Sequence, residues 1–437
     1  MLCKYWVNVV YYIDNFIEMR EKMKVTKDTV KRFDFEKKPH RPGFLMSVAK
    51  FVISKPDLKK RGFSLEKVNM DNLEGPYLLL VTHSSMVDFN IMLMATHPHP
   101  VNNVMTLEGF RDYTEILMRH LGVLGTRKFV ADIHLVKNMK YCVEKLGSIF
   151  ALFPEARYSL DGCTSYLPQS LGKMVKLLQV PVVVLEIHGN FVTCPQWNKM
   201  NKKTYVEAKM KQILTTDEIK NLSYQEINKC IKENFQYDDF KWQAEKKIKI
   251  DHPKRAQGLH CLLYKCSNCE TEGEMYSEGI RLWCEHCKKE WIMDEYGKLV
   301  SRDGESRFSH IPDWSNWERA CVRKEIEEGT YYFEDSVSVE TLPGSKRFYK
   351  QGMGKFIQTP TETRLECNYF SEPYILVRNA KNLESMHIEY DYHKQGDCID
   401  ISVPEESFWC YMSKRDVITK ISFATEEMHK IAMRIED

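Results

Sequence analysis

Residues 77–88 read Tyr-Leu-Leu-Leu-Val-Thr-His-Ser-Ser-Met-Val-Asp, and this stretch decides the fold. The apolar run 77–81 follows a Gly-Pro turn signal and predicts a short buried strand. Residues 84–94 predict an apolar helix whose first turn contains Asp88. His83 lies between the two elements, at the end of the strand. Open α/β sheets place their chemistry at the carboxyl ends of parallel strands, so this is a position for a functional side chain.

The same pattern recurs twice further along the chain. Residues 147–153 (Gly-Ser-Ile-Phe-Ala-Leu-Phe) are a second apolar run, and Pro-Glu follows directly at 154–155. Residues 180–187 (Val-Pro-Val-Val-Val-Leu-Glu-Ile) are as continuous and β-branched as a strand covered on both faces. We therefore expect an α/β domain over residues 56–250, with a mostly parallel sheet flanked by helices.

His83 and Asp88 are the first candidates for chemistry. An imidazole titrates near neutrality and can take the proton of an attacking hydroxyl. A carboxylate one turn into the next helix can hold the other ring nitrogen, fix the tautomer and stabilise the imidazolium. Taken alone, the spacing is weak, because about one chance match is expected in a chain of this composition. A lone histidine beside two serines is also often a neighbour of a helix cap.

Four blocks together resemble the glycerolipid acyltransferase family, typified by 1-acylglycerol-3-phosphate acyltransferase. The family's Asn-His-x4-Asp block resembles residues 82–88, and its Gly-x-x-x-x-Arg segment resembles 122–128. Its Phe-Pro-Glu-Gly-Thr-Arg-Ser block is similar to residues 153–159, and its proline-containing apolar strand to 180–185. All four occur in family order, which is much more specific than any single block.

The resemblance implies transfer of a fatty acyl group, without a covalent acyl-enzyme, to the hydroxyl of a lysophospholipid such as 1-acylglycerol-3-phosphate. The donor would be acyl-CoA or the thioester of acyl carrier protein, and both remain open. His83 would be the general base, Asp88 its orienting partner, and Glu155 would bind or position the acceptor. In the alternative interpretation, Glu155 is a carboxylate in the first turn of a helix, where it complements the helix dipole. Three basic residues are candidates for an acceptor phosphate and are equally a solvated positive face: Arg127, Lys128 and Arg157.

The third block departs from the family pattern. Ala156 stands where Gly is usual, Arg157 where Thr is usual and Tyr158 where Arg is usual, so the guanidinium is displaced by one position. Arginine grips phosphate through two parallel hydrogen bonds, a geometry that depends on where the side chain starts. The displacement favours, as an alternative, an acyltransferase for an acceptor without phosphate. A catalytically silent, lipid-binding scaffold is the alternative outside the enzymes.

Two Cys-x-x-Cys knuckles, fourteen residues apart, define a second site. Four thiolates at this separation predict a closed, tetrahedral zinc site that supports structure and not catalysis. Short strands expected at 264–265 and 281–283 would make residues 258–300 a zinc ribbon. The metal of such a ribbon stabilises a segment that is too small to bury its own core, or the ribbon binds a partner. The predicted ligands are Cys266, Cys269, Cys284 and Cys287.

Residues after the ribbon have a different pattern. A charged helix is expected within the linker 301–330, where Gly329 ends it. From 331 to 437, alternating runs such as 337–342 and 398–403 predict strands, and a last helix covers about 416–435. Several antiparallel strands closed by a terminal helix resemble a small pleckstrin-homology-like barrel. We therefore predict a β-rich domain at this end.

Composition limits the partners. The 437 residues carry 63 basic and 61 acidic side chains, a net charge of +2, so no nucleic acid is expected as a partner.

The sequence contains no run of eighteen apolar residues, so no membrane-spanning helix is predicted. Residues 1–55, with an aromatic stretch at 5–12 and a basic and apolar one at 37–46, suit an anionic lipid surface or, equally, a core helix. Fourteen cysteines without a signal peptide favour the cytoplasm, so we expect a peripheral protein on the cytoplasmic face of the membrane.

Overall fold

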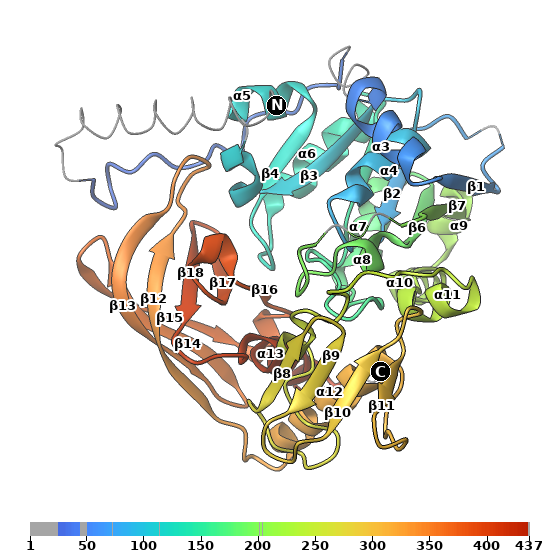
Figure 1. The fold of residues 1–437 in the computed structure, drawn as a ribbon. Coiled ribbons are helices and arrows are strands. Elements are labelled where there is room, and N and C mark those ends of the chain that lie inside the picture. Colours follow the sequence, from blue (N-terminus) through green and yellow to red (C-terminus); the bar gives the residue numbers. More distant parts are fainter. Residues whose placement is uncertain are drawn as a thin grey trace.

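The computed structural model describes residues 25–43, 50–71, 73–112, 114–200, 202 and 204–435. They form a seven-stranded mixed sheet with helices, a four-stranded antiparallel sheet and a seven-stranded antiparallel sheet, in that order along the chain (Figure 1). This confirms the predicted class, which was an α/β part followed by a small cysteine-rich sheet and a β-rich part. The predicted lipid-facing residues 5–12 and 44–46 lie outside the described ranges.

The first sheet has the strand order β1-β7-β6-β2-β5-β3-β4. The five strands from β6 to β4 run parallel to one another, whereas β7 pairs antiparallel with β6 and parallel with β1. The sheet is therefore mostly parallel, as predicted. Its strands are β1 (Ser64–Val68), β2 (Leu78–Val81), β3 (Val101–Thr106), β4 (Val123–Thr126), β5 (Ile149–Leu152), β6 (Val182–His188) and β7 (Glu207–Leu214).

Helices cover both faces of this sheet, which explains why β2 and β6 are so apolar. Leu79 and Val81 of β2 pack on one face with α3 (Lys55–Lys60) and α4 (Val87–Ala95). Leu78 and Leu80 pack on the other with α6 (Ile133–Glu144), α7 (Ser170–Leu178), α9 (Thr216–Asn221) and α10 (Tyr224–Asn234). A strand buried on both faces needs apolar side chains at every position. The remaining helical segments of this part are η1 (Lys50–Ser54), η2 (Leu107–Asp112), α5 (Glu115–His120), α8 (Asn190–Thr193) and α11 (Asp239–Glu245).

The second cysteine knuckle lies in the small sheet, with Cys284 at the end of β9 and Cys287 in the turn before β10. The sheet has the order β11-β10-β9-β8, and a short η3 (Leu259–Cys261) precedes it. The expected strand at 281–283 is present as β9, but the one at 264–265 is wrong, since Lys265 makes only an isolated bridge with Glu272. The strands are β8 (Met275–Glu278), β9 (Arg281–Cys284), β10 (Glu290–Met293) and β11 (Leu299–Ser301).

The third sheet curves around the last helix as a half-barrel (Figure 1). Its order is β15-β14-β13-β12-β18-β17-β16, with antiparallel pairs throughout. Apolar residues of α13 (Ile418–Met433), such as Ile421 and Phe423, share one core with Phe356 and Ile401 of the sheet. The other elements are η4 (Ala380–Asn382), η5 (Tyr392–Lys394), α12 (Ile311–Glu327), β12 (Phe333–Thr341), β13 (Tyr349–Gln358), β14 (Glu362–Tyr369), β15 (Glu372–Asn379), β16 (His387–Glu389), β17 (Cys398–Val403) and β18 (Glu406–Met412).

The helices of the described ranges are too short or too polar to cross a bilayer.

Candidate active site and metal site

The carboxyl ends of three neighbouring strands meet at one edge of the first sheet. Leu80 of β2 pairs with Leu152 of β5 and also with Val184 of β6, and all three strands run in the same direction. The residues that follow these strands therefore leave the sheet side by side, as expected of an α/β site. They include the side chains that form the candidate active site: His83, Asp88, Glu155 and Asn190.

The imidazole of His83 is bound to the carboxylate of Asp88. The distance from Nδ1 to Oδ2 is 3.1 Å, and the Asp88 side chain is completely buried. A carboxylate accepts hydrogen bonds, so Nδ1 carries the proton and Nε2 keeps a free lone pair. The histidine side chain itself is 22% exposed, so a substrate can reach it. This is the arrangement of a general base held by an orienting carboxylate.

Asp88 also determines where its helix begins. Its Oδ2 accepts hydrogen bonds from the backbone N–H of Ser84 at 2.6 Å and of Ser85 at 3.0 Å. These bonds fold residues 84–86 into a turn, so α4 starts at Val87, three residues later than the sequence predicted. Oδ1 accepts a hydrogen bond from the Asn190 side chain. The carboxylate is therefore fixed by four donors, including His83, and cannot rotate away from the imidazole.

Two aromatic rings pack against the imidazole of His83. Phe153 and Tyr158 both lie with their ring centroids 4.3 Å from that of the imidazole. Phe153 follows β5, and Tyr158 occupies the position where the family pattern has arginine. The packing restricts the ring orientation in addition to the hydrogen bond that Nδ1 donates to Asp88. The third block thus contacts the base through aromatic side chains.

Glu155 lies behind His83 and is not open to solvent. Its Oε2 accepts a hydrogen bond from the backbone N–H of His83 at 3.0 Å, and its Oε1 accepts from the N–H of Ser165 at 2.7 Å and from the hydroxyl of Tyr237 at 2.9 Å. Burial raises the pKa of Glu155 to about 7, although these hydrogen bonds lower it. The predicted role of Glu155, to bind or position the acceptor, stays a prediction, and in the described structure its carboxylate contacts the main chain of His83.

Arg157 points into the junction with the last helix. Its Nη2 lies 2.6 Å from Oε1 of Glu426 in α13, and both side chains are buried. Its Nε and Nη1 are buried as well, with no hydrogen-bond partner in the described structure. Nη2 of the guanidinium therefore binds Glu426 of α13, whereas the N–H groups of Nε and Nη1 donate to no group of the described structure. Ala156, which precedes Arg157, adopts φ of 54°, in the left-handed region that favours glycine.

Arg127 and Lys128 are engaged with other parts of the chain. The guanidinium of Arg127 donates to the carbonyl oxygens of Leu342, Pro343 and Glu405, at 2.9 to 3.2 Å, and to the Ser407 hydroxyl at 2.8 Å. Lys128 pairs with Glu108 at 3.0 Å. The predicted phosphate contact of these two residues stays a prediction, since in the described structure both side chains bind protein groups. Arg127 instead fastens the first sheet to the third.

Two residues of the site were absent from the sequence prediction. Asn190 follows the proline-containing strand of the fourth block, and that position was the only signal pointing to it. Tyr237 lies between α10 and α11 and reaches Glu155 across the fold. No local pattern marks it, because its contact depends on how two distant segments pack.

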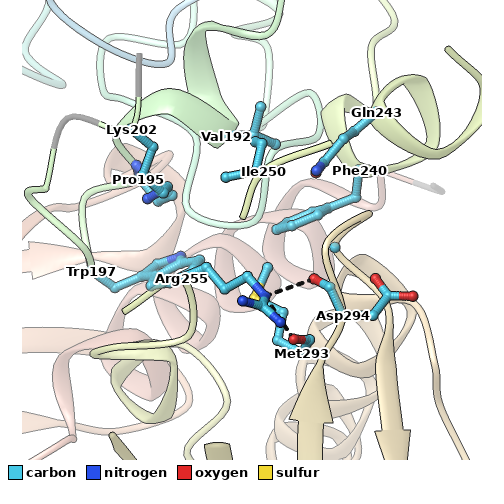
Figure 2. Close-up of a pocket in the computed structure, with 11 residues that line it drawn as sticks. Val192, Pro195, Trp197, Lys202, Phe240, Gln243, Ile250, Arg255, Met293 and Asp294 are labelled. Carbon is cyan, nitrogen blue, oxygen red and sulfur yellow. Dashed lines mark hydrogen bonds between the residues drawn. The ribbon is translucent and has the colours of Figure 1, made fainter. Parts of the chain in front are cut away.

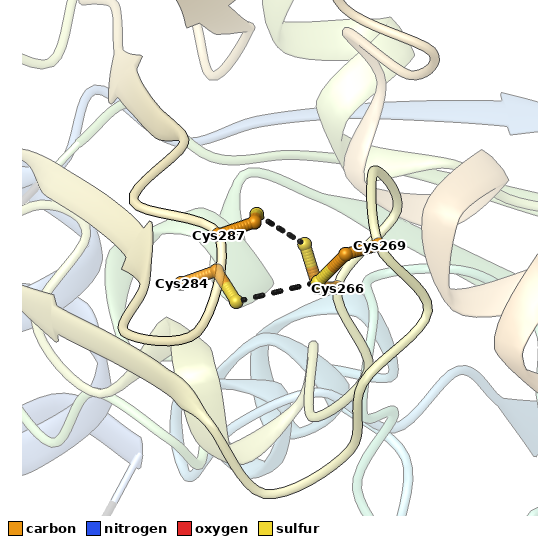
Figure 3. A group of neighbouring side chains, drawn as sticks. All are labelled: Cys266, Cys269, Cys284 and Cys287. Atoms are coloured by element: carbon orange, nitrogen blue, oxygen red, sulfur yellow. Dashed lines mark hydrogen bonds between the residues drawn. The ribbon is translucent and has the colours of Figure 1, made fainter.

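The four predicted cysteines come together beside the small sheet (Figure 3). The Sγ atoms of Cys266 and Cys287 lie 3.7 Å apart, as do those of Cys269 and Cys284. Zinc–sulfur bonds of about 2.3 Å in a tetrahedron place sulfurs about 3.8 Å apart, so the cluster fits zinc without rearrangement. Four thiolates leave no open coordination position, and the ion would support structure. The cluster can therefore hold a structural metal such as zinc.

A small cavity lies among α11, the segment after β6 and the small sheet (Figure 2). It has room for about one water molecule. The Nζ atom of Lys202, which lines it, is buried without a hydrogen-bond partner. The cavity is too small for a lipid or thioester, and we assign it no part in the chemistry.

Comparison with known proteins adds little to this geometry. No family model matches the chain, and no curated protein matches it. Among solved structures, the chain is similar to the 1-acyl-sn-glycerophosphate (LPA) acyltransferase PlsC from Thermotoga maritima. The sequence identity is 16% and the TM-score is 0.36, over 53% of this chain and 89% of that chain.

Proposed function

We propose that this chain is an acyltransferase that moves a fatty acyl group from acyl-CoA or acyl-ACP to the hydroxyl of a lysophospholipid such as 1-acylglycerol-3-phosphate. The observation that carries the proposal is the His83–Asp88 pair, in which a buried carboxylate holds Nδ1 and leaves Nε2 free. The four sequence blocks support acyl transfer as the reaction. No side chain of the site is placed as a nucleophile beside His83, so the attacking oxygen comes from the acceptor.

In the proposed reaction, Nε2 of His83 accepts the proton of the acceptor hydroxyl while its oxygen attacks the thioester carbonyl carbon. Asp88 stabilises the imidazolium that forms. The tetrahedral intermediate then collapses with cleavage of the carbon–sulfur bond. The imidazolium returns its proton to the leaving thiolate, so the products are an ester and a free thiol. Glu155 and Asn190 hold the base and its carboxylate in place during both proton transfers.

The contacts of the basic residues support a second class of acceptor, an alcohol without a phosphate group. Arg127 and Lys128 bind protein groups, so neither is open to a phosphate in this arrangement. Arg157 is the remaining basic residue of the predicted set, with two unpartnered nitrogens. We propose the phosphorylated acceptor first because Arg157 retains these donors. Its exchange for methionine should raise KM for a phosphorylated acceptor more than KM for an unphosphorylated one.

We also propose that the protein works at the surface of a membrane, on its cytoplasmic face. A lipid acceptor must pass from a bilayer to His83, and three apolar side chains on this part of the chain are exposed. Met86, in the turn after His83, is 67% exposed, and Phe51 and Val52 are 47% and 68% exposed. Apolar side chains beside basic residues such as Lys55 suit an anionic interface. Binding to vesicles with and without anionic lipid would test this.

The direct test is thiol release by the full chain with acyl-CoA or acyl-ACP and a panel of phosphorylated and unphosphorylated acceptors. His83→Gln should lower the rate by about a hundredfold or more. His97→Gln, which changes an exposed histidine, should not. Thiol release that needs neither an acceptor nor His83 would contradict the proposal. If the zinc-loaded wild type releases no thiol with either donor, the catalytically silent scaffold becomes the better account.

A further inference from the structure

A second group of metal-binding side chains lies outside the four-cysteine cluster. His260, Cys261 and Asp416 each bring one ligand atom to a common point, with these atoms within 4.8 Å of one another. Nε2 of His260 is 3.7 Å from Sγ of Cys261 and 3.8 Å from Oδ1 of Asp416. The first two residues belong to η3, before the small sheet, and Asp416 lies just before α13. Three different donor types thus converge from two distant segments.

The distances suit a borderline divalent ion. Zinc bonds of about 2.3 Å to sulfur and 2.0 to 2.2 Å to nitrogen and oxygen, at tetrahedral angles, separate S and N by about 3.6 Å and N and O by about 3.4 Å. The observed separations of 3.7 and 3.8 Å exceed these values by about 0.1 and about 0.4 Å, which side-chain rotation can supply. Thiolate and imidazole exclude magnesium and calcium, which take oxygen ligands.

The histidine is oriented for binding. Its Nδ1 lies 2.7 Å from the hydroxyl of Ser277 in β8. With that hydroxyl as acceptor, Nδ1 carries the proton and the lone pair of Nε2 points to Cys261 and Asp416. Metal-binding histidines almost always have their second nitrogen fixed in this way. Ser277 thus corresponds to the outer partner of a metal ligand.

The turn that carries both ligands is held in place. Thr419 of α13 donates a hydrogen bond to the carbonyl of Cys261 at 2.6 Å, and the N–H of His260 donates to Ser277 at 3.4 Å. Gly258 begins the turn with φ of +84°, and a Cβ there would lie 2.0 Å from the carbonyl oxygen of Trp197. Neighbouring residues can direct their side chains to one point only in such a constrained turn. The ligands are therefore arranged before any ion binds.

The charges around the group also fit an ion. The guanidinium of Arg415 holds Oδ2 of Asp416 at 3.2 Å and leaves Oδ1 to face His260. One thiolate and one carboxylate balance a divalent ion, with the imidazole neutral. Cys261 would release its proton to solvent as the ion binds.

We propose that His260, Cys261 and Asp416 bind a second zinc ion, with the fourth position open to water. This ion would connect the turn before the small sheet to the start of α13. It would do so independently of the four-cysteine cluster and of the proposed acyl transfer. Since α13 carries Glu426, the partner of Arg157, the ion would stabilise the helix that contacts the candidate active site.

Metal content of the full chain tests this proposal. The purified protein, loaded with zinc and freed of excess ion, should contain two zinc ions per chain by elemental analysis. His260→Gln, Cys261→Ser and Asp416→Asn should each reduce this to one. With Co²⁺ in place of zinc, each variant should keep the charge-transfer absorption of a four-thiolate site and lose the weaker contribution of a single-thiolate site. Cys321→Ser, which changes a cysteine outside both groups, should retain two ions.

Two results would overturn the proposal. One is a single zinc ion per chain in the wild type together with an intact four-thiolate Co²⁺ spectrum, which would mean that the three residues form only hydrogen bonds. The other is retention of both ions in all three variants. Circular dichroism of each variant separates loss of a ligand from loss of the fold, and His260→Gln and Asp416→Asn preserve side-chain volume if Cys261→Ser does not fold.

Discussion

Nη2 of Arg157 and Oε1 of Glu426 lie 2.6 Å apart, and this contact joins the third sequence block to the last helix of the chain. Glu426 also binds Arg319 of α12 at 2.6 Å, so one buried carboxylate holds two arginines. Arg157 is two residues from Glu155, which supports the main chain of His83. The orientation of the base is thus connected to the β-rich part of the molecule.

Breaking this pair should destabilise the whole chain. Glu426→Leu removes the carboxylate and leaves buried arginines, a change that costs about 3 to 5 kcal/mol in the free energy of unfolding. Arg157→Met together with Glu426→Leu should recover part of that loss. Urea unfolding of the single and double variants measures the coupling. Additive effects would show that the two side chains do not interact in solution.

The same carboxylate should make stability depend on pH in acid. Burial raises the pKa of Glu426, but Arg157 and Arg319 outweigh it and lower the pKa to about 2. A carboxyl whose pKa is lower in the folded state contributes stability above its unfolded pKa and loses it as pH falls. Between pH 4.5 and 2, the difference in free energy of unfolding between wild type and Glu426→Gln should shrink by about 3 kcal/mol. A constant difference would mean that Glu426 is not ionised in the fold.

Asp88→Asn should abolish most activity without unfolding the chain. The amide oxygen takes the place of Oδ2, which accepts from the N–H groups of Ser84 and Ser85, and the negative charge that stabilises the imidazolium is lost. We expect the rate of thiol release to fall by about a hundredfold or more, with unchanged circular dichroism. Asp71→Asn, at an exposed position, is the matched control. Equal rates for the two variants would exclude Asp88 as the partner of the base.

Glu155→Gln separates positioning from acceptor binding. Glutamine has one oxygen to replace a carboxylate that accepts from His83, Ser165 and Tyr237. A positioning role predicts that kcat falls by about tenfold, while KM for the acceptor is unchanged. A raised KM with normal kcat would instead show that Glu155 binds the acceptor, as the sequence suggested.

Removal of the four-cysteine metal should open the small sheet. Cys284→Ser, or chelation of the wild type, leaves thiolates without their ion, and a metal-dependent segment then unfolds. Trp291 of β10 is completely buried, so its fluorescence should shift to longer wavelength. Cys230→Ser, in α10, should leave the emission unchanged. No shift in the metal-free protein would show that packing alone maintains the sheet.

The sequence indicated the parts of the site that depend on local pattern. Strand ends, the His83–Asp88 spacing and the two cysteine knuckles can be read within a few residues, and the strands and cysteines lie where they were predicted. The start of α4 was predicted three residues too early, because the carboxylate of Asp88 binds the N–H groups of Ser84 and Ser85 and folds residues 84–86 into a turn. The strand at 264–265 was also wrong, because Lys265 makes only an isolated bridge with Glu272.

The basic residues show why the rest could not be predicted. Arg127 and Arg157 looked like phosphate ligands from their position beside two blocks. Their partners, Pro343 and Glu426, lie more than 200 residues away in the sequence. A single sequence carries no signal that would bring such segments together. The role of Tyr237 beside Glu155 was hidden for the same reason.

The Arg157–Glu426 contact also has a consequence for biosynthesis. A ribosome makes the first sheet long before the last helix, and domains tend to fold as they emerge. Until residue 426 has left the exit tunnel, Arg157 has no carboxylate to bind. The growing chain therefore lacks this contact at the third sequence block until α13 has been made.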